Sequence, residues 1–121
     1  MKDILIVGLG GFIGSGSRYA VYLLSAKLYA DKPYLGTLLV NLLGCLLIGL
    51  LSGGIVKMNN QTGLFLVAGL CGGFTTFSTF ALDGFKLIRE GLIVQFVTYA
   101  SVSIIGGLLL CLAGFYLMNK A

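Results

Sequence analysis

The stretch Gly72–Phe80, GGFTTFSTF, lies inside a long apolar segment that runs from Gly63 to Leu82. Gly72 and Gly73 weaken a helix and can break it, and four hydroxyl residues and three phenylalanines follow within seven positions. Backbone groups released by a break cannot stay unpaired in hydrocarbon, so they must meet protein, water or an ion. The stretch therefore predicts a broken membrane helix, with free carbonyls that suit a cation and a new helix N-terminus that suits an anion.

The composition around this stretch is typical of an integral membrane protein. Of the 121 residues, 58% are hydrophobic and only 10% are charged, which predicts a single transmembrane domain over residues 1–121. The sequence has no histidine, which removes the commonest general base and metal ligand. The three cysteines lie in apolar segments without CxxC spacing, so we expect no disulfide framework and no side-chain metal site. These features argue against an enzyme.

Four apolar segments are long enough to cross a bilayer as helices, which takes about 20 residues each. They cover residues 4–24, 36–56, 63–82 and 92–118. They are separated by a polar loop (25–35), a short turn (57–62) and a charged connection (83–91) that can be helical in part. The expected fold is an all-α membrane protein of four transmembrane helices, with a break in the third and both termini on the same side.

The basic residues of the connections are nearly balanced between the two sides of this arrangement. Three lie on the side of the termini and four on the opposite side, with Arg18 inside the first span left out. They are Lys2, Lys57 and Lys120 on the first side, and Lys27, Lys32, Lys86 and Arg89 on the second. Such a balance predicts insertion in both orientations and an antiparallel dual-topology dimer. The alternative is one orientation set by weaker cues.

Small residues favour close helix packing and, we expect, oligomerisation. Gly10 and Gly14 share a face in the first span, and Gly49 and Gly53 share one in the second. A third stripe in the fourth span consists of Ser103, Gly107 and Cys111.

Polar residues inside the spans need a partner or a function, because they are costly in hydrocarbon. Arg18 either extends to the interface or places a positive charge at a pore mouth. Asn41 either joins two helices by a hydrogen bond or donates its amide to a permeating anion. None of the four spans contains Asp or Glu. A positive vestibule without a buried acid favours a path for anions.

Two phenylalanines of the central motif also suit an anion. Phe77 and Phe80 are three residues apart and share a helix face. The edge of a phenyl ring carries the positive end of its quadrupole, so two such edges could line an anion path without holding the ion tightly. The alternative is a kinked helix with ordinary aromatic packing.

Three motifs together resemble the Fluc fluoride channels of the CrcB family over nearly the whole chain. They are GGFIGSGSR (10–18), GTLLVN (36–41) and GLCGGFTTFSTF (69–80). The resemblance implies an antiparallel dimer with two separate fluoride pores and a structural sodium ion (Na+) on the twofold axis. It also implies that no pump or coupled energy source is involved.

The resemblance also assigns roles to residues. It implies that Phe77 and Phe80 contact fluoride through their ring edges and that Asn41 donates its amide. The backbone carbonyls of Gly72 and Thr75 would hold sodium. The remaining residues would be Arg18 in the vestibule, Thr37 at the start of the second span, Thr76, Ser78 and Thr79 in the hydroxyl-bearing break, and Ser103 on the fourth helix.

One feature departs from the family pattern. The family often carries a polar track on the fourth helix, whereas this chain has Gly107 and Cys111 at two of the corresponding places. A homodimer and a heterodimer with a homologue therefore both stay open.

We expect a passive fluoride-selective channel in a bacterial inner membrane. It would let cytoplasmic fluoride leave and so confer fluoride resistance, with lipid and a second subunit as partners and no role for nucleic acid. A dual-topology small multidrug transporter is the alternative, but it should carry a mid-helix glutamate in the first span. A structural or assembly subunit would leave Asn41 and TTFSTF unexplained.

Overall fold

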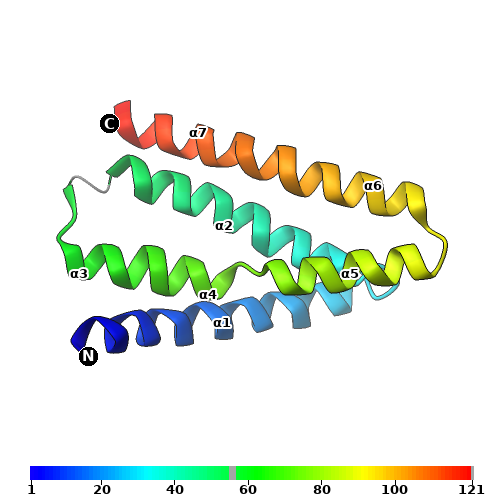
Figure 1. Ribbon diagram of the computed structural model, residues 1–121, viewed down its shortest axis with the longest axis horizontal. Coiled ribbons are helices and arrows are strands. Elements are labelled where there is room, and N and C mark those ends of the chain that lie inside the picture. The colour runs from blue at the N-terminus through cyan, green and yellow to red at the C-terminus, as the bar shows by residue number, and fades with distance from the viewer. Residues whose placement is uncertain (55–56, 121) are drawn as a thin grey trace.

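The computed structural model describes residues 1–54 and 57–120. Within these ranges the chain forms four long helical segments and no strand, and all four are long and apolar enough to cross a membrane. Figure 1 shows them running side by side, with both termini at the same end of the molecule. The number of spans and the all-α class predicted from the sequence are therefore confirmed.

The first two segments are single helices, α1 (Lys2–Leu28) and α2 (Tyr34–Gly54). The third consists of α3 (Asn60–Gly63), η2 (Leu64–Cys71), α4 (Gly72–Phe74) and α5 (Phe77–Arg89). The fourth consists of α6 (Ile93–Ser101), η3 (Val102–Gly106) and α7 (Gly107–Lys120). The segments η2 and η3 are π-helical, with wider turns than an α-helix, and the sequence analysis did not anticipate them.

The ends of these segments follow local chemistry. Pro33, which cannot donate a backbone hydrogen bond, comes directly before α2. The Asn59 side chain accepts a hydrogen bond from the Thr62 amide at 2.8 Å and caps the start of α3. Gly91 adopts φ +77°, a left-handed conformation that favours glycine and closes the end of α5.

The helices extend further than the sequence predicted. The first continues past residue 24 to Leu28, and α5 continues through most of the charged connection to Arg89. Lys86 and Arg89 lie in the last turn of α5, where basic side chains are favoured by the helix dipole. The predicted end of the second span at residue 56 and the final residue of the domain, 121, lie outside the described residues.

The helix break is not at the two glycines. Gly72 and Gly73 are helical, and the chain becomes extended at Thr75 (φ −87°, ψ 158°) and Thr76 (φ −152°, ψ 121°). Gly73 is explained by packing instead, since a Cβ there would lie 2.6 Å from the Gly11 carbonyl oxygen. The expectation that the glycine pair breaks the helix is corrected to a break at Thr75–Thr76.

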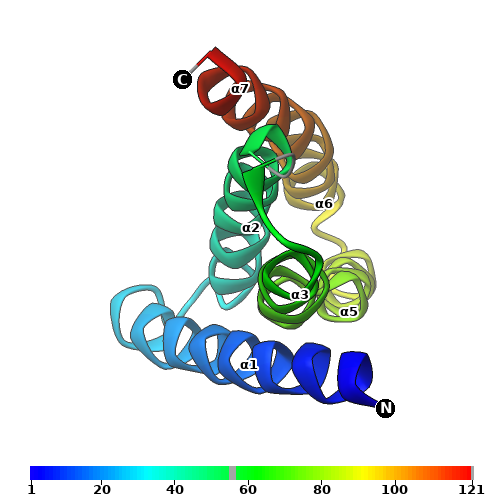
Figure 2. The same cartoon turned by 90° about the vertical axis from the view of Figure 1, so that its left-hand side faces the viewer.

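Glycine contacts arrange the helices in two closely packed pairs. A Cβ at Gly10 or Gly14 of α1 would overlap backbone atoms of η2, and one at Gly49 of α2 would overlap the Cys111 carbonyl of α7. Gly53 likewise lies against the backbone of Phe115. These glycine motifs therefore serve packing within the chain rather than the oligomer contacts expected from the sequence. Figure 2 shows α1 beside the third segment, and α2 beside the fourth.

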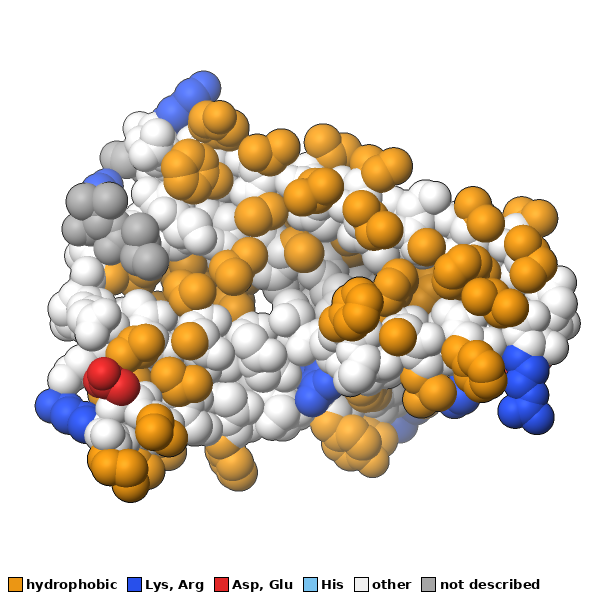
Figure 3. Space-filling model, viewed as in Figure 1, with side chains coloured by type: hydrophobic (Ala, Val, Ile, Leu, Met, Phe, Trp, Pro, Cys, Tyr) orange, Lys and Arg blue, Asp and Glu red, His pale blue; other side chains and the backbone are white. Residues whose placement is uncertain are grey.

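The outer surface is largely apolar. Figure 3 shows hydrophobic side chains spread over the helices, with lysine and arginine side chains mostly toward the ends of the molecule. Large residues such as Phe12, Val94 and Leu117 are exposed along the spans. Such a surface suits contact with lipid or with a second chain.

Candidate functional site

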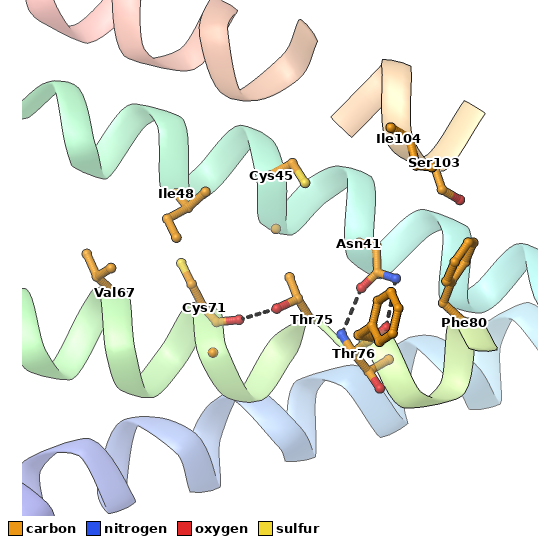
Figure 4. A pocket seen from close by; sticks show the side chains of 13 residues that line it. Asn41, Cys45, Ile48, Val67, Cys71, Thr75, Thr76, Phe80, Ser103 and Ile104 are labelled. Carbon is orange, nitrogen blue, oxygen red and sulfur yellow. Dashed lines mark hydrogen bonds between the residues drawn. The ribbon is translucent and has the colours of Figure 1, made fainter. Parts of the chain in front are cut away.

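A cavity of about 400 Å³ lies between α2, the third segment and η3, beside the helix break. Figure 4 shows its lining side chains. It brings together many of the residues singled out by the sequence: Asn41, Gly72, Thr75, Thr76, Phe77, Phe80 and Ser103. The rest of the lining is small, apolar or thiol-bearing: Gly44, Cys45, Ile48, Val67, Cys71 and Ile104. No Asp or Glu lines this cavity, so its polar groups are amide, hydroxyl and backbone atoms.

The Asn41 side chain pairs with the backbone of the break. Its Oδ1 accepts a hydrogen bond from the Thr76 amide at 2.8 Å, and its Nδ2 donates one to the Thr76 carbonyl at 3.0 Å. One amide side chain thus satisfies both backbone groups of Thr76, which is only 8% exposed. The interhelical hydrogen bond considered for Asn41 is present, and Nδ2 keeps a second hydrogen that Thr76 does not engage.

The Thr76 hydroxyl organises the start of α5. Its Oγ1 accepts a hydrogen bond from the Thr79 amide at 3.2 Å, as an N-cap residue does, and donates one to Thr79 Oγ1, also at 3.2 Å. Ser78 Oγ lies 3.4 Å from the same hydroxyl, and Ser78 is exposed. The hydroxyls of Thr76, Ser78 and Thr79 therefore lie together at the break.

These contacts divert two amides from the helix ladder. In a continuous helix the Thr76 amide would bond to the Gly72 carbonyl, and the Thr79 amide to the Thr75 carbonyl. They bond instead to Asn41 Oδ1 and Thr76 Oγ1. The Gly72 and Thr75 carbonyls thus lose their ladder donors. Backbone carbonyls without a hydrogen-bond donor are oxygen groups that suit a hard cation.

The two phenylalanines of the motif lie together at the cavity. The ring centroids of Phe77 and Phe80 are 5.8 Å apart, with an interplanar angle of 43°. Phe77 is 80% exposed on the single chain, so packing within the chain does not account for it. Phe80 also contacts the Tyr99 ring at 5.1 Å, and Tyr99 contacts Tyr34 at the same distance.

Tyr99 was missed by the sequence analysis. It is 2% exposed, and its hydroxyl donates to Asp83 Oδ2 at 3.2 Å. It precedes Ser103 by four residues, so the stripe of Ser103, Gly107 and Cys111, extended one turn toward the N-terminus, would have found it. Asp83 lies within α5, at the start of the charged connection 83–91.

A second cavity of about 260 Å³ holds two further predicted residues, Thr37 and Thr79. Tyr22 and Asp83 are also in its lining, together with Ala26 and Pro33. Arg18 is half-exposed on α1 and lines neither cavity, and Ser78 lines neither. The predicted site is therefore divided between two cavities and the outer surface.

Of the fourth-helix stripe, Ser103 alone faces the first cavity. Ser103 Oγ is shielded from solvent and has no hydrogen-bond partner within the described residues. A Cβ at Gly107 would lie 3.1 Å from Cys45 Sγ, so the thiol occupies the space that a side chain at 107 would need. The cavity wall next to Ser103 thus carries a thiol from α2 in the space that a side chain at 107 would otherwise fill.

The fold and the cavities together define a multi-pass helical membrane protein with polar groups at a broken helix. Residues 5–115 match the family described as "CrcB-like protein, Camphor Resistance (CrcB)". The chain belongs to this family, as the sequence motifs indicated.

Curated relatives cover almost the full chain. Azobacteroides pseudotrichonymphae has a "Fluoride-specific ion channel FluC" that is 41% identical over 97% of this chain and 96% of its own length. Proteins of the same name in Phocaeicola vulgatus and Elusimicrobium minutum are 41% and 45% identical, over 97% and 96% of this chain and 98% and 90% of their own lengths.

Proposed function

We propose that the protein is a passive, fluoride-selective channel that lets cytoplasmic fluoride leave a bacterial cell and so confers fluoride resistance. The names of its family relatives indicate an ion channel and not an enzyme. The observation that carries the proposal is the cavity in which the Asn41 amide lies beside Phe77 and Phe80 with no carboxylate in the lining. Neutral donors without an acid suit an anion and do not suit the cationic substrates of a multidrug exporter.

Several weak donors would replace the water around fluoride. Asn41 Nδ2 has one hydrogen left after its bond to Thr76, and Ser103 Oγ has no partner within the described residues. The ring edges of Phe77 and Phe80 add positive ends of quadrupoles. A permeating ion must be held well enough to lose water but loosely enough to leave, which a set of weak sites achieves better than one strong site.

The assembly we propose is an antiparallel dimer in the inner membrane. Gly72 and Phe77 are exposed on the single chain although they lie at the middle of the third segment. A second subunit, inserted in the opposite orientation, would cover them and complete the wall of each pore. The partner is either a second copy or a homologue. In this chain the Cys45 thiol fills the space beside Gly107, so a homologue that carries a hydroxyl residue at the position of Gly107 is a specific candidate.

Sodium fits the break as a structural ion. The Gly72 and Thr75 carbonyls have lost their ladder donors, and two from each subunit would give four oxygen ligands. When bound, sodium would supply a positive charge that satisfies these carbonyls at the centre of the dimer. The chain's own contribution is to keep the helix amide donors away from the Gly72 and Thr75 carbonyls.

A fluoride-electrode assay on purified protein in liposomes tests the function. Vesicles loaded with potassium fluoride should release fluoride when a potassium ionophore removes the opposing voltage, and vesicles loaded with chloride should release little chloride. Equal release of fluoride and chloride would refute a fluoride-selective channel. The absence of fluoride release, both from the chain alone and from the chain combined with a homologue from the same genome, would also refute it.

A further inference from the structure

We infer that Asn41 is a positioning residue for the sodium site, although it is not one of the proposed ligands. Through Thr76 it keeps the carbonyls of Gly72 and Thr75 out of the helix ladder. The side chain that faces the anion path would then also determine how well the cation binds. This inference rests on the sodium site proposed above.

The first step is the pairing between Asn41 and Thr76, which are 35 residues apart in sequence. The two hydrogen bonds, at 2.8 and 3.0 Å, engage both ends of the side-chain amide. Thr76 is buried, so water is poorly placed to take over from Asn41. A buried amide left without an acceptor is costly, and the nearest replacement along the chain is the Gly72 carbonyl in a continued helix.

The second step passes through the Thr76 hydroxyl. With Thr76 held in an extended conformation, Oγ1 reaches back to accept from the Thr79 amide at 3.2 Å. This bond removes the donor that the Thr75 carbonyl would have in a continuous helix. If Thr76 became helical, both carbonyls would regain ladder donors and offer less to a cation.

The third step concerns coupling between the ions. The bonds that hold the break use Oδ1 and one hydrogen of Nδ2, and they orient the remaining hydrogen of an amide that lines the cavity. Any shift of Thr76 therefore moves the anion donor and the cation ligands together. Sodium binding should favour the Asn41 orientation that serves fluoride, and by linkage the effect is reciprocal for binding.

The test measures thermal unfolding of the purified full-length protein against sodium concentration, with choline replacing sodium at constant chloride. Asn41→Leu removes both bonds at similar volume. Thr76→Val removes the hydroxyl and keeps the branched shape, whereas Thr76→Ser keeps the hydroxyl. Thr98→Val is the matched control, because the Thr98 hydroxyl bonds only to its own helix, at the Val94 carbonyl.

The unfolding temperature of wild type should begin to rise once sodium exceeds its apparent dissociation constant, and should then rise logarithmically with sodium. The sodium concentration at which this rise begins should be about tenfold higher in Thr76→Val, as expected when one hydrogen bond that prepares the site is lost, and at least tenfold higher in Asn41→Leu, which removes two. It should stay within about threefold of wild type in Thr76→Ser and Thr98→Val. A purely structural role would lower the unfolding temperature equally in sodium and choline and would leave this concentration unchanged.

The outcomes separate the two proposals. If wild type shows no sodium effect, the sodium site itself is refuted, and this inference with it. A sodium effect that begins at the same concentration in wild type, Asn41→Leu and Thr76→Val would overturn the inference and leave the site standing. If Asn41→Leu does not fold, the sodium dependence of Thr76→Val is compared with that of Thr76→Ser. Equal sodium dependence in these two variants would overturn the inference.

Discussion

Replacing Phe77 or Phe80 by isoleucine should separate a pore role of the rings from a packing role. Isoleucine is apolar and bulky but has no ring quadrupole. Phe77 is 80% exposed on the single chain and contacts one ring, Phe80, so Phe77→Ile should cost the subunit no more than about 0.5–1.5 kcal/mol. Phe80 contacts two rings, Phe77 and Tyr99, so Phe80→Ile should cost about 1–3 kcal/mol at roughly 0.5–1.5 kcal/mol for each aromatic pair.

The effect on fluoride flux should depend on the ring quadrupole and not on how well each ring is packed. An ion that faces a desolvated ring gains about 1–2 kcal/mol from the quadrupole when the sign is right, and we assume the same size for fluoride at a ring edge. Loss of one such contact at the rate-limiting barrier would slow flux by roughly 5–30-fold. Phe77→Ile should therefore lose more flux than its small loss of stability explains, which ordinary packing does not predict. Phe80→Met should be milder, because its thioether is flexible and polarisable.

The assay is fluoride efflux from liposomes, divided by the amount of folded dimer measured by size-exclusion chromatography of the same preparation. Packing alone would reduce flux only in proportion to the folded protein lost. Normal assembly of Phe77→Ile with wild-type flux per dimer would show that the rings do not line the path.

Two further predictions concern helix packing and orientation. Gly14→Ala should destabilise the protein by about 1–3 kcal/mol, because its Cβ would overlap the Leu70 carbonyl. The control Gly16→Ala has nothing within 4 Å of its Cβ and should be nearly neutral in thermal unfolding. Equal effects of the two substitutions would contradict the close packing of α1 on η2. Single cysteines at Asn60 and Lys32, in a background without the native three, should each react from both sides of the membrane, and labelling of each site from one side only would exclude an antiparallel homodimer.

The class of protein and the number of spans followed from composition and hydropathy, because both are local properties of each segment. The central motif was also informative, since hydroxyls, glycines and phenylalanines in one apolar run have no simple role in a lipid-facing helix. Five of its residues line the first cavity: Gly72, Thr75, Thr76, Phe77 and Phe80. Tyr99 escaped because an aromatic residue in a membrane helix is ordinary until a neighbour such as Asp83 is known.

The position of the break could be decided only by the tertiary structure. Glycine has a weaker helix preference than any residue except proline, so the sequence pointed to Gly72 and Gly73. These residues are nevertheless helical, and α1 packs closely against Gly73. The chain leaves the helix at Thr76, where Asn41 from another helix supplies the hydrogen bonds that the ladder gives up. A local pattern shows which residues weaken a helix, but the helix opens where a partner distant in sequence can satisfy the freed backbone groups.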